Sequence, residues 1–255
     1  MDPSSTRTTL FGIFVLAGRS LTAAQVIALA RPLRISATNV KSHLTRMVAE
    51  GSLERTGPKR AAQYRPAPSK AAVVEGIEAR LESHPEAPWD GEWIVLALKM
   101  PVPRGERDRL RASLWFDGFR PWDGATFVRP AWPKTWAQAR ARGYLDRAPG
   151  IALHGALLGD IPVDRLYGLD ALDREARRLA RRIRAKRAPA GSPARAFGSR
   201  LEIGGLVARL VGHDPRLPQA LWGKRTGMRE LSRQFARFEK RAASPARRFL
   251  ESVLG

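Results

Sequence analysis

The first 65 residues carry apolar positions in the pattern of three short helices followed by two extended segments. From Thr6 to Ala17, apolar residues recur three and four positions apart, which indicates one helix face turned inward. A second helix is expected to begin at Thr22, because Thr22 and Gln25 have the spacing of a capping box. Ser36 is suited to cap a third helix that reaches Glu50. The pattern therefore predicts a helix-turn-helix.

Two extended segments follow these helices. Ser52 to Thr56 and Gln63 to Arg65 flank a Gly-Pro-Lys-Arg turn at residues 57–60, as in a β-hairpin. A hairpin directly after a helix-turn-helix is typical of a winged helix. We therefore expect residues 1–68 to form an N-terminal winged helix-turn-helix that binds DNA.

The middle of the chain alternates between strand and helix patterns. Residues 69–88 are expected to be a connecting helix and linker, and residues 89–168 a separate domain that takes part in dimerisation. Strands are expected at Glu92–Lys99, Ala125–Arg129 and Ile151–Leu158, and helices at Gly105–Asp117, Trp136–Gly143 and near Val163–Tyr167. This alternation favours a ferredoxin-like sandwich, although the pattern leaves the fourth strand and the strand order open.

From residue 169 onward the apolar positions return to helical spacing. Residues 169–255 are therefore expected to form a helical C-terminal domain, with a role in effector binding or dimerisation. The fold class predicted for the whole chain is α+β.

The charge of the chain indicates which classes of partner it can bind. Lys and Arg number 45 among 255 residues against 24 Asp and Glu, so the formal net charge is +21. A protein this basic often binds a polyanion, and nucleic acid is the first candidate. Cysteine is absent, which excludes disulfides and cysteine nucleophiles. With no apolar run of about 20 residues, we expect a cytoplasmic protein with no membrane partner.

The third predicted helix carries the candidate DNA-reading residues. Val40, Leu44 and Met47 fall on one side, which leaves polar and basic residues on the other. Asn and Arg can read base edges, whereas Ser, Thr and Lys suit phosphate contacts. The alternative is an ordinary solvated helix face. The predicted DNA-binding residues, including two cations and one glutamine of the hairpin, are Ser36, Thr38, Asn39, Lys41, Ser42, Thr45, Arg46, Lys59, Arg60 and Gln63.

Three stretches of the chain resemble the PaaX family of transcriptional regulators. The first runs from Asn39 to Gly51 and continues with Leu53-Glu-Arg55. The second begins with Trp89-Asp-Gly-Glu-Trp93 and ends with Phe127-Val-Arg-Pro130. The third is His213-Asp-Pro-Arg-Leu-Pro218. The resemblance implies a homodimer with a winged-helix head, which represses an operon for phenylacetate-type aromatic acid catabolism and is released from its operator by an aryl-CoA thioester.

The resemblance also suggests a role for the many basic residues between positions 174 and 187. This basic run could be a solvated helix face, a second contact to the DNA backbone, or a surface for the phosphates of an acyl-CoA effector. The candidate effector-binding residues are Arg174, Arg177, Arg178 and Arg181.

An enzyme is the main alternative class. The middle domain is similar to small CRISPR-associated nucleases, which hold a divalent metal with an acidic residue near the first strand. Lys99 stands at that place here, and a cation is no ligand for magnesium. The four histidines show no metal-ligand spacing, and no catalytic signature is present, so we expect no catalytic residues, no metal and no cofactor. A metal-dependent nuclease and a nonspecific architectural protein remain the alternatives to a regulator.

Overall fold

The computed structural model describes residues 3–58, 61–82, 88–100, 103–157, 159–186 and 192–255. The chain is of the α+β class and divides into two compact units, each built from separate stretches of sequence. The first unit comprises Met1–Glu82, Leu179–Arg209 and Leu231–Gly255, and the second comprises Ser83–Arg178 and Leu210–Glu230. These units divide the chain at other points than the four segments expected from the sequence, because residues 169–255 contribute to both units.

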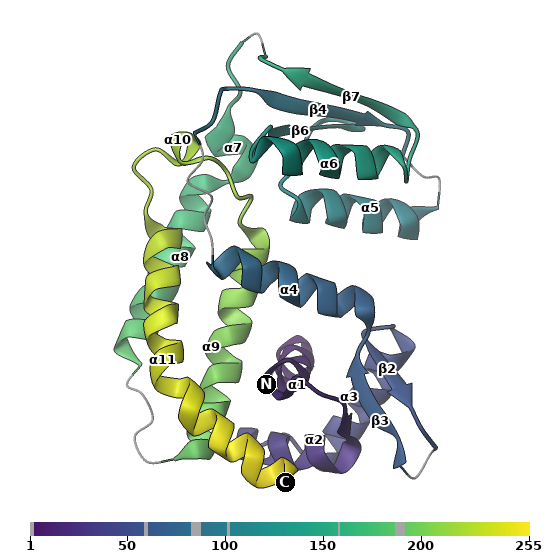
Figure 1. Cartoon of the computed structure of the whole chain (residues 1–255), viewed down its shortest axis with the longest axis vertical. Coiled ribbons are helices and arrows are strands. Elements are labelled where there is room, and N and C mark those ends of the chain that lie inside the picture. The colour runs from purple at the N-terminus through teal and green to yellow at the C-terminus, as the bar shows by residue number, and fades with distance from the viewer. Residues whose placement is uncertain (1–2, 59–60, 83–87, 101–102, 158, 187–191) are drawn as a thin grey trace. The chain divides into compact units, whose positions relative to one another are not determined.

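The N-terminal part of the first unit follows the predicted order of helices and hairpin (Figure 1). Its elements are α1 (Pro3–Ala17), β1 (Leu21–Thr22), α2 (Ala23–Ala30), the 3-10 helix η1 (Arg31–Leu33), α3 (Ala37–Ala49), β2 (Leu53–Thr56), β3 (Gln63–Pro66) and α4 (Pro68–Glu82). The capping box predicted at Thr22 and Gln25 is present. The Thr22 side chain accepts a hydrogen bond from the Gln25 backbone N–H, and the Gln25 side chain accepts one from the Thr22 backbone N–H.

The sheet of this unit is antiparallel, with strand order β1-β3-β2. Strand β1 was not predicted, because two residues are too few to show the alternation of a strand. Leu21 and Thr22 of β1 pair with Tyr64 and Gln63 of β3, so the chain before α2 forms one edge of the sheet.

Both ends of the chain contribute to a hydrophobic core of the first unit. Leu10 and Phe14 of α1 are buried in the same cluster as Leu44 of α3. Five buried residues of the C-terminal helices join this cluster, namely Ala196, Phe197, Leu201, Ala246 and Leu250. Burial of these apolar side chains against each other is what holds α1 to α3 and the C-terminal helices in one unit.

The C-terminal helices are α8 (Leu169–Ala185), α9 (Pro193–His213), α10 (Gln219–Trp222) and α11 (Gly227–Leu254). Within the first unit, Glu202 of α9 forms ion pairs with Arg182 of α8 and with Lys186, which directly follows α8. Arg200 of α9 pairs with Glu239 of α11 at 2.5 Å. None of the helices among the described residues has the length and apolar content to cross a membrane.

The second unit contains a four-stranded antiparallel sheet with order β5-β6-β4-β7. The chain passes through it as β4 (Trp93–Leu98), α5 (Arg104–Phe116), β5 (Arg120–Asp123), β6 (Thr126–Pro130), α6 (Lys134–Leu145), β7 (Gly150–Gly155) and α7 (Val163–Tyr167). Helices α5 and α6 lie on one face of the sheet (Figure 1), where Leu96, Leu114 and Phe127 are in the core. Strand β5 was not predicted, because Pro121 and an irregular register at Pro121/Asp123 interrupt its pattern.

In the second unit, the backbone just after α5 lies very close to the turn after α9. Gly118 has a φ of +80°, and a Cβ atom there would lie 2.6 Å from the Pro215 carbonyl oxygen. The turn is held by the Arg216 backbone N–H, which donates to Oδ1 of Asp214 at 2.8 Å. The residues that follow this turn line a pocket described below.

Candidate nucleic-acid interface

Helix α3 is positioned by its cap and by its apolar face. The Oγ of Ser36 accepts a hydrogen bond from the Asn39 backbone N–H at 3.2 Å, which confirms the predicted N-cap. Val40, Leu44 and Met47 are buried in the core of the first unit, as predicted. Because this face is buried, the opposite face of α3 is oriented toward solvent.

The predicted base-reading and phosphate-contacting residues of α3 share that exposed face. The side chains that are exposed are Ser36, Thr38, Asn39, Lys41, Ser42, Thr45 and Arg46. Two of them are ordered by neighbours one turn away: an Arg46 guanidinium nitrogen donates to Oγ of Ser42 at 3.0 Å, and the Thr45 hydroxyl donates to the Lys41 carbonyl oxygen at 3.1 Å. The guanidinium of Arg46 is therefore held along the helix surface, with donors left over for a ligand.

The charge around α3 is predominantly positive. The helix contains no acidic residue, and the nearest one, Glu50 just after its end, forms an ion pair with Arg7 of α1 at 2.6 Å. His43 lies on the inner side of α3 and is buried. Burial lowers the pKa of His43, and the charges of Arg46 and Arg7 lower it further. His43 is thus a neutral core residue near pH 7, and the cations of α3 lie on the other side.

Of the predicted hairpin residues, Gln63 is exposed on β3, opposite Thr56 of β2. The predicted wing-tip cations Lys59 and Arg60 lie outside the described residues. On the two strands, Arg65 pairs with Glu54 at 2.8 Å, which neutralises both side chains.

Two exposed arginines near α3 were not among the predicted DNA-binding residues. Arg55 is on β2, and Arg34 has a φ of 59° in the turn between η1 and α3. A signal was present for both, since Arg55 lies in the extended segment predicted after the recognition helix and Arg34 precedes the cap of that helix. Residue type alone could not show that these side chains are exposed on the unit that presents α3.

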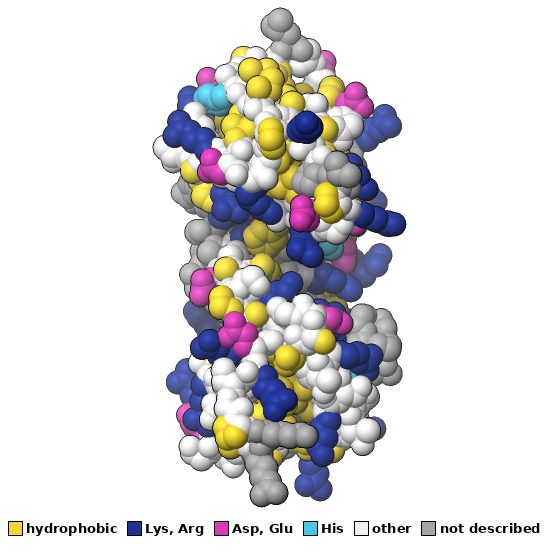
Figure 2. Space-filling view, turned by 90° about the vertical axis from the view of Figure 1, so that its right-hand side faces the viewer, with side chains coloured by type: hydrophobic (Ala, Val, Ile, Leu, Met, Phe, Trp, Pro, Cys, Tyr) yellow, Lys and Arg dark blue, Asp and Glu magenta, His cyan; other side chains and the backbone are white. Residues whose placement is uncertain are grey.

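Basic residues are also common elsewhere on the surface. On the face drawn in Figure 2, Lys and Arg side chains outnumber Asp and Glu, in line with the net charge of +21. A positive surface attracts a polyanion but does not by itself select one part of the protein. The grouping of polar and basic side chains on one helix face is therefore the more specific feature.

The four candidate effector-binding arginines are all exposed on α8, opposite its buried apolar stripe. Arg174, Arg177 and Arg178 are in the part of α8 that belongs to the second unit, and Arg181 is in the part that belongs to the first. Arg177 donates to Oδ2 of Asp173 at 2.7 Å and to the Thr226 hydroxyl at 3.1 Å. Arg177 therefore helps to hold the second unit together. The guanidinium groups of the other three arginines form no hydrogen bond or ion pair within the described part of the chain.

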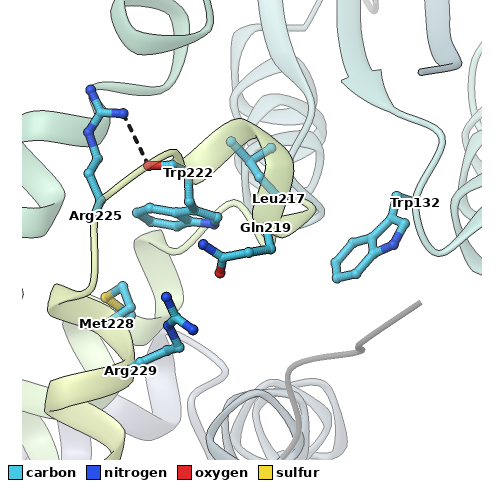
Figure 3. Close-up of a pocket in the computed structure, with 7 residues that line it drawn as sticks. All are labelled: Trp132, Leu217, Gln219, Trp222, Arg225, Met228 and Arg229. Carbon is cyan, nitrogen blue, oxygen red and sulfur yellow. Dashed lines mark hydrogen bonds between the residues drawn. The ribbon is translucent and has the colours of Figure 1, made fainter. Parts of the chain in front are cut away.

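A pocket in the second unit is shown in Figure 3. Its volume is about 50 Å³, and its apolar wall includes Trp132, Trp222 and Met228. Arg225 at its edge donates to the Trp222 carbonyl oxygen at 3.3 Å and is ion-paired with Asp164 and Asp170, so its charge is neutralised within the unit. Drug-sized ligands occupy pockets of about 300–1,000 Å³. This pocket therefore has room for a small group only.

Among the described residues, no three His, Asp or Glu side chains lie close enough together to hold a metal ion. His154 instead contacts Glu92 at 2.9 Å, and Lys134 contacts the same carboxylate at 2.6 Å. Lys99 directly follows β4 and is exposed.

Comparisons with known proteins show similarity at the level of the fold. No protein-family model matches the chain, and no curated protein matches it in sequence. Among solved structures, the chain is similar to the uncharacterized protein Rv0674 from Mycobacterium tuberculosis, with a TM-score of 0.56 and 20% sequence identity. The alignment covers 99% of this chain and 98% of the other. The two proteins thus share a fold along nearly their whole lengths.

Proposed function

We propose that this protein is a DNA-binding transcriptional regulator in which residues 3–66 form a winged helix-turn-helix. In this proposal α3 enters the major groove, the β2–β3 hairpin contacts the adjacent backbone, and the β4–β7 unit is a ferredoxin-like sandwich. Its α-β-β-α arrangement between β4 and β7 and its strand order support that assignment.

One observation carries the proposal. Seven polar or basic side chains on or beside α3 are exposed together, while the opposite face of this helix is buried. An amphipathic helix of that kind, capped by Ser36 and free of acidic residues, matches what a groove of DNA requires. Lys41 suits a phosphate contact, and Asn39 and Arg46 suit base edges.

We further propose that the regulator is a homodimeric repressor whose ligand is an acyl-CoA of aromatic-acid catabolism, as the resemblance to PaaX implies. Arg174, Arg178 and Arg181 are the proposed phosphate-binding residues, because they are exposed and have guanidinium donors to offer. Helices α9 and α11 contribute residues to the same core as α1 and α3, which supports coupling between effector binding and DNA binding. A shift in these helices would repack the residues that support the DNA-binding head.

Selection of bound duplexes from a random DNA library tests the proposed function. A regulator should enrich one sequence motif, which then resists excess nonspecific competitor in a gel shift. Binding that any competitor abolishes would instead indicate an architectural protein. Cleavage of the duplex with magnesium or manganese, prevented by a chelator, would indicate a nuclease.

A further inference from the structure

Strand β7 is an open edge of the sheet in the second unit. Among the described residues it pairs with β4 alone, from Gly150 opposite Leu98 to Gly155 opposite Trp93, with no shift in register. Its other side thus carries a row of backbone donors and acceptors along six residues.

The two edges of this sheet differ in how they are protected. The opposite edge, β5, contains Pro121, an irregular register and the charged Asp123, and α7 packs beside it. These features prevent pairing with another strand. Strand β7 has none of them, because its sequence is Gly-Ile-Ala-Leu-His-Gly.

The side chains of β7 add an apolar surface to the open edge. Ile94, Leu96 and Leu98 of β4 are in the core beneath α5 and α6. Their partners on β7 are His154, Ala152 and Gly150, so Ile151 and Leu153 are on the other face of the sheet. Ile151 and Leu153 are each 60% exposed, more than any other large apolar side chain among the described residues. Exposed apolar residues on an unprotected edge strand mark an interaction site.

We infer that β7 pairs antiparallel with β7 of a second copy of this chain, joining two sheets across a two-fold axis. This inference deepens the proposed function, on which it rests for the dimeric state. Antiparallel pairing of a strand with itself is self-complementary, as a two-fold interface requires.

Charge favours a second copy over another protein as the occupant. Each chain has a net charge of +21, so two copies repel each other over most of their surfaces. From Ala148 to Gly159 the chain contains no Lys, Arg, Asp or Glu. An acidic partner would be drawn to the cations elsewhere, whereas two copies can meet here without placing like charges opposite each other. His154 does not interfere, since its ring is held by Glu92 and Gln138.

The register follows from the faces of the sheet. If the helices of both copies lie on the same side, residues that share a face must be opposite each other. Centring the pair on Ala152 places Ile151 of one copy opposite Leu153 of the other and joins their apolar surfaces. In this register the two Ala152 residues are directly opposite, with Cα atoms about 4.5–5.5 Å apart.

The test measures the mass of the full chain in solution by light scattering without DNA. The wild type should be a dimer, and the double variant Ile151→Lys, Leu153→Lys a folded monomer, because four lysines would then meet at the edge. Trp122→Lys is the matched control, since Trp122 is 52% exposed on β5. It should remain dimeric. A monomeric wild type, or a double variant that stays dimeric, would overturn the inference.

A cysteine variant tests the register independently of stability. The natural chain has no cysteine, so Ala152→Cys introduces a single thiol. Mild oxidation should link two copies, because directly opposite residues satisfy disulfide geometry. Trp122→Cys should remain unlinked. Linking of Trp122→Cys but not of Ala152→Cys would contradict the proposed pairing.

These results are separable from the proposed function. If β7 pairing fails but the library selection yields a motif, the protein is a regulator that dimerises elsewhere or acts as a monomer. If β7 pairing holds but no DNA is bound, the interface stands and the assignment of α3 is wrong.

Discussion

The hydroxyl of Tyr144 on α6 donates a hydrogen bond of 2.7 Å to Oδ2 of Asp117, the residue that ends α5. Both residues are buried, and Arg140 contacts the same oxygen at 2.6 Å. Arg129 of β6 donates to the Asp117 backbone carbonyl. Asp117 thus joins α5 and α6 to the sheet of the second unit.

Tyr144→Phe should therefore destabilise the protein by about 1.5–3 kcal/mol, because it leaves a buried carboxylate short of one donor. Tyr167→Phe should cost less, about 1 kcal/mol, since its hydroxyl donates to the neutral Val128 carbonyl at 3.3 Å. Tyr64→Phe is the control, as no hydrogen bond of the half-buried Tyr64 side chain is found within the described residues. Urea denaturation followed by tryptophan fluorescence measures all three. Equal losses would show that the Asp117 contacts do not matter.

Ser36 offers a way to separate helix capping from DNA binding. Ser36→Ala should lower the stability of the first unit by about 1 kcal/mol, whereas Ser36→Asp should retain the cap. A carboxylate at the exposed end of α3 should nevertheless repel DNA. Ser36→Asp should therefore bind DNA more weakly than Ser36→Ala, although Ser36→Asp is the more stable variant. Thermal unfolding and gel shifts provide the two measurements.

Thr22→Asp is the matched control for this pair, because Thr22 caps α2 instead of α3. It should leave DNA affinity within about twofold of that of the wild type, a change of less than 0.5 kcal/mol. A similar loss of binding in both Asp variants would show that added negative charge acts from any position in the head.

Lys41 and Arg46 should differ in what they contribute to binding. Lys41→Ala should weaken binding to all duplexes and reduce the slope of log K against log salt by about 0.9. Arg46→Ala should relax the preference at one base pair, at a cost of about 1–3 kcal/mol for the preferred site. We expect Lys59→Ala with Arg60→Ala to behave like Lys41→Ala, with a larger change in slope.

Salt titrations of gel shifts on preferred and scrambled duplexes distinguish these effects. Arg111→Ala removes one exposed cation of α5 and serves as the control. It should leave both the slope and the preference unchanged. If Arg111→Ala and Lys41→Ala give the same slope, DNA is bound by diffuse charge and not by α3.

The lowered pKa of His43 predicts a pH dependence of stability. Because the ordinary value is 6.5 and burial lowers it, the unfolded chain takes up this proton at higher pH than the folded one. The free energy of unfolding should therefore fall as pH decreases below about 6.5, before the carboxylates begin to titrate. Thermal unfolding of the wild type and of His43→Gln between about pH 7.5 and 5 measures this. The variant should lose most of the dependence in this range, and an unchanged slope would contradict it.

Local features of the site were predictable from sequence. The caps at Thr22 and Ser36 and the polar face of α3 depend on residues within a few positions of each other, and all are present as expected. The positions of Arg34 and Arg55 were less predictable. Their exposure depends on how a turn and a strand are oriented beside α3, which residue type alone does not encode.

The sequence by itself determined the helices of the N-terminal head, their caps and the polarity of α3, because hydrogen bonds and side-chain periodicity within one element act over short distances. Tertiary structure decided what each apolar stripe packs against. Phe197 and Leu250 are far from the N-terminal head in the sequence, and only the fold joins them to Phe14 in one core. Tertiary structure also decided that Ile151 and Leu153, which lie in a strand predicted from the sequence, are on an open edge, because strand order is set by contacts between distant segments.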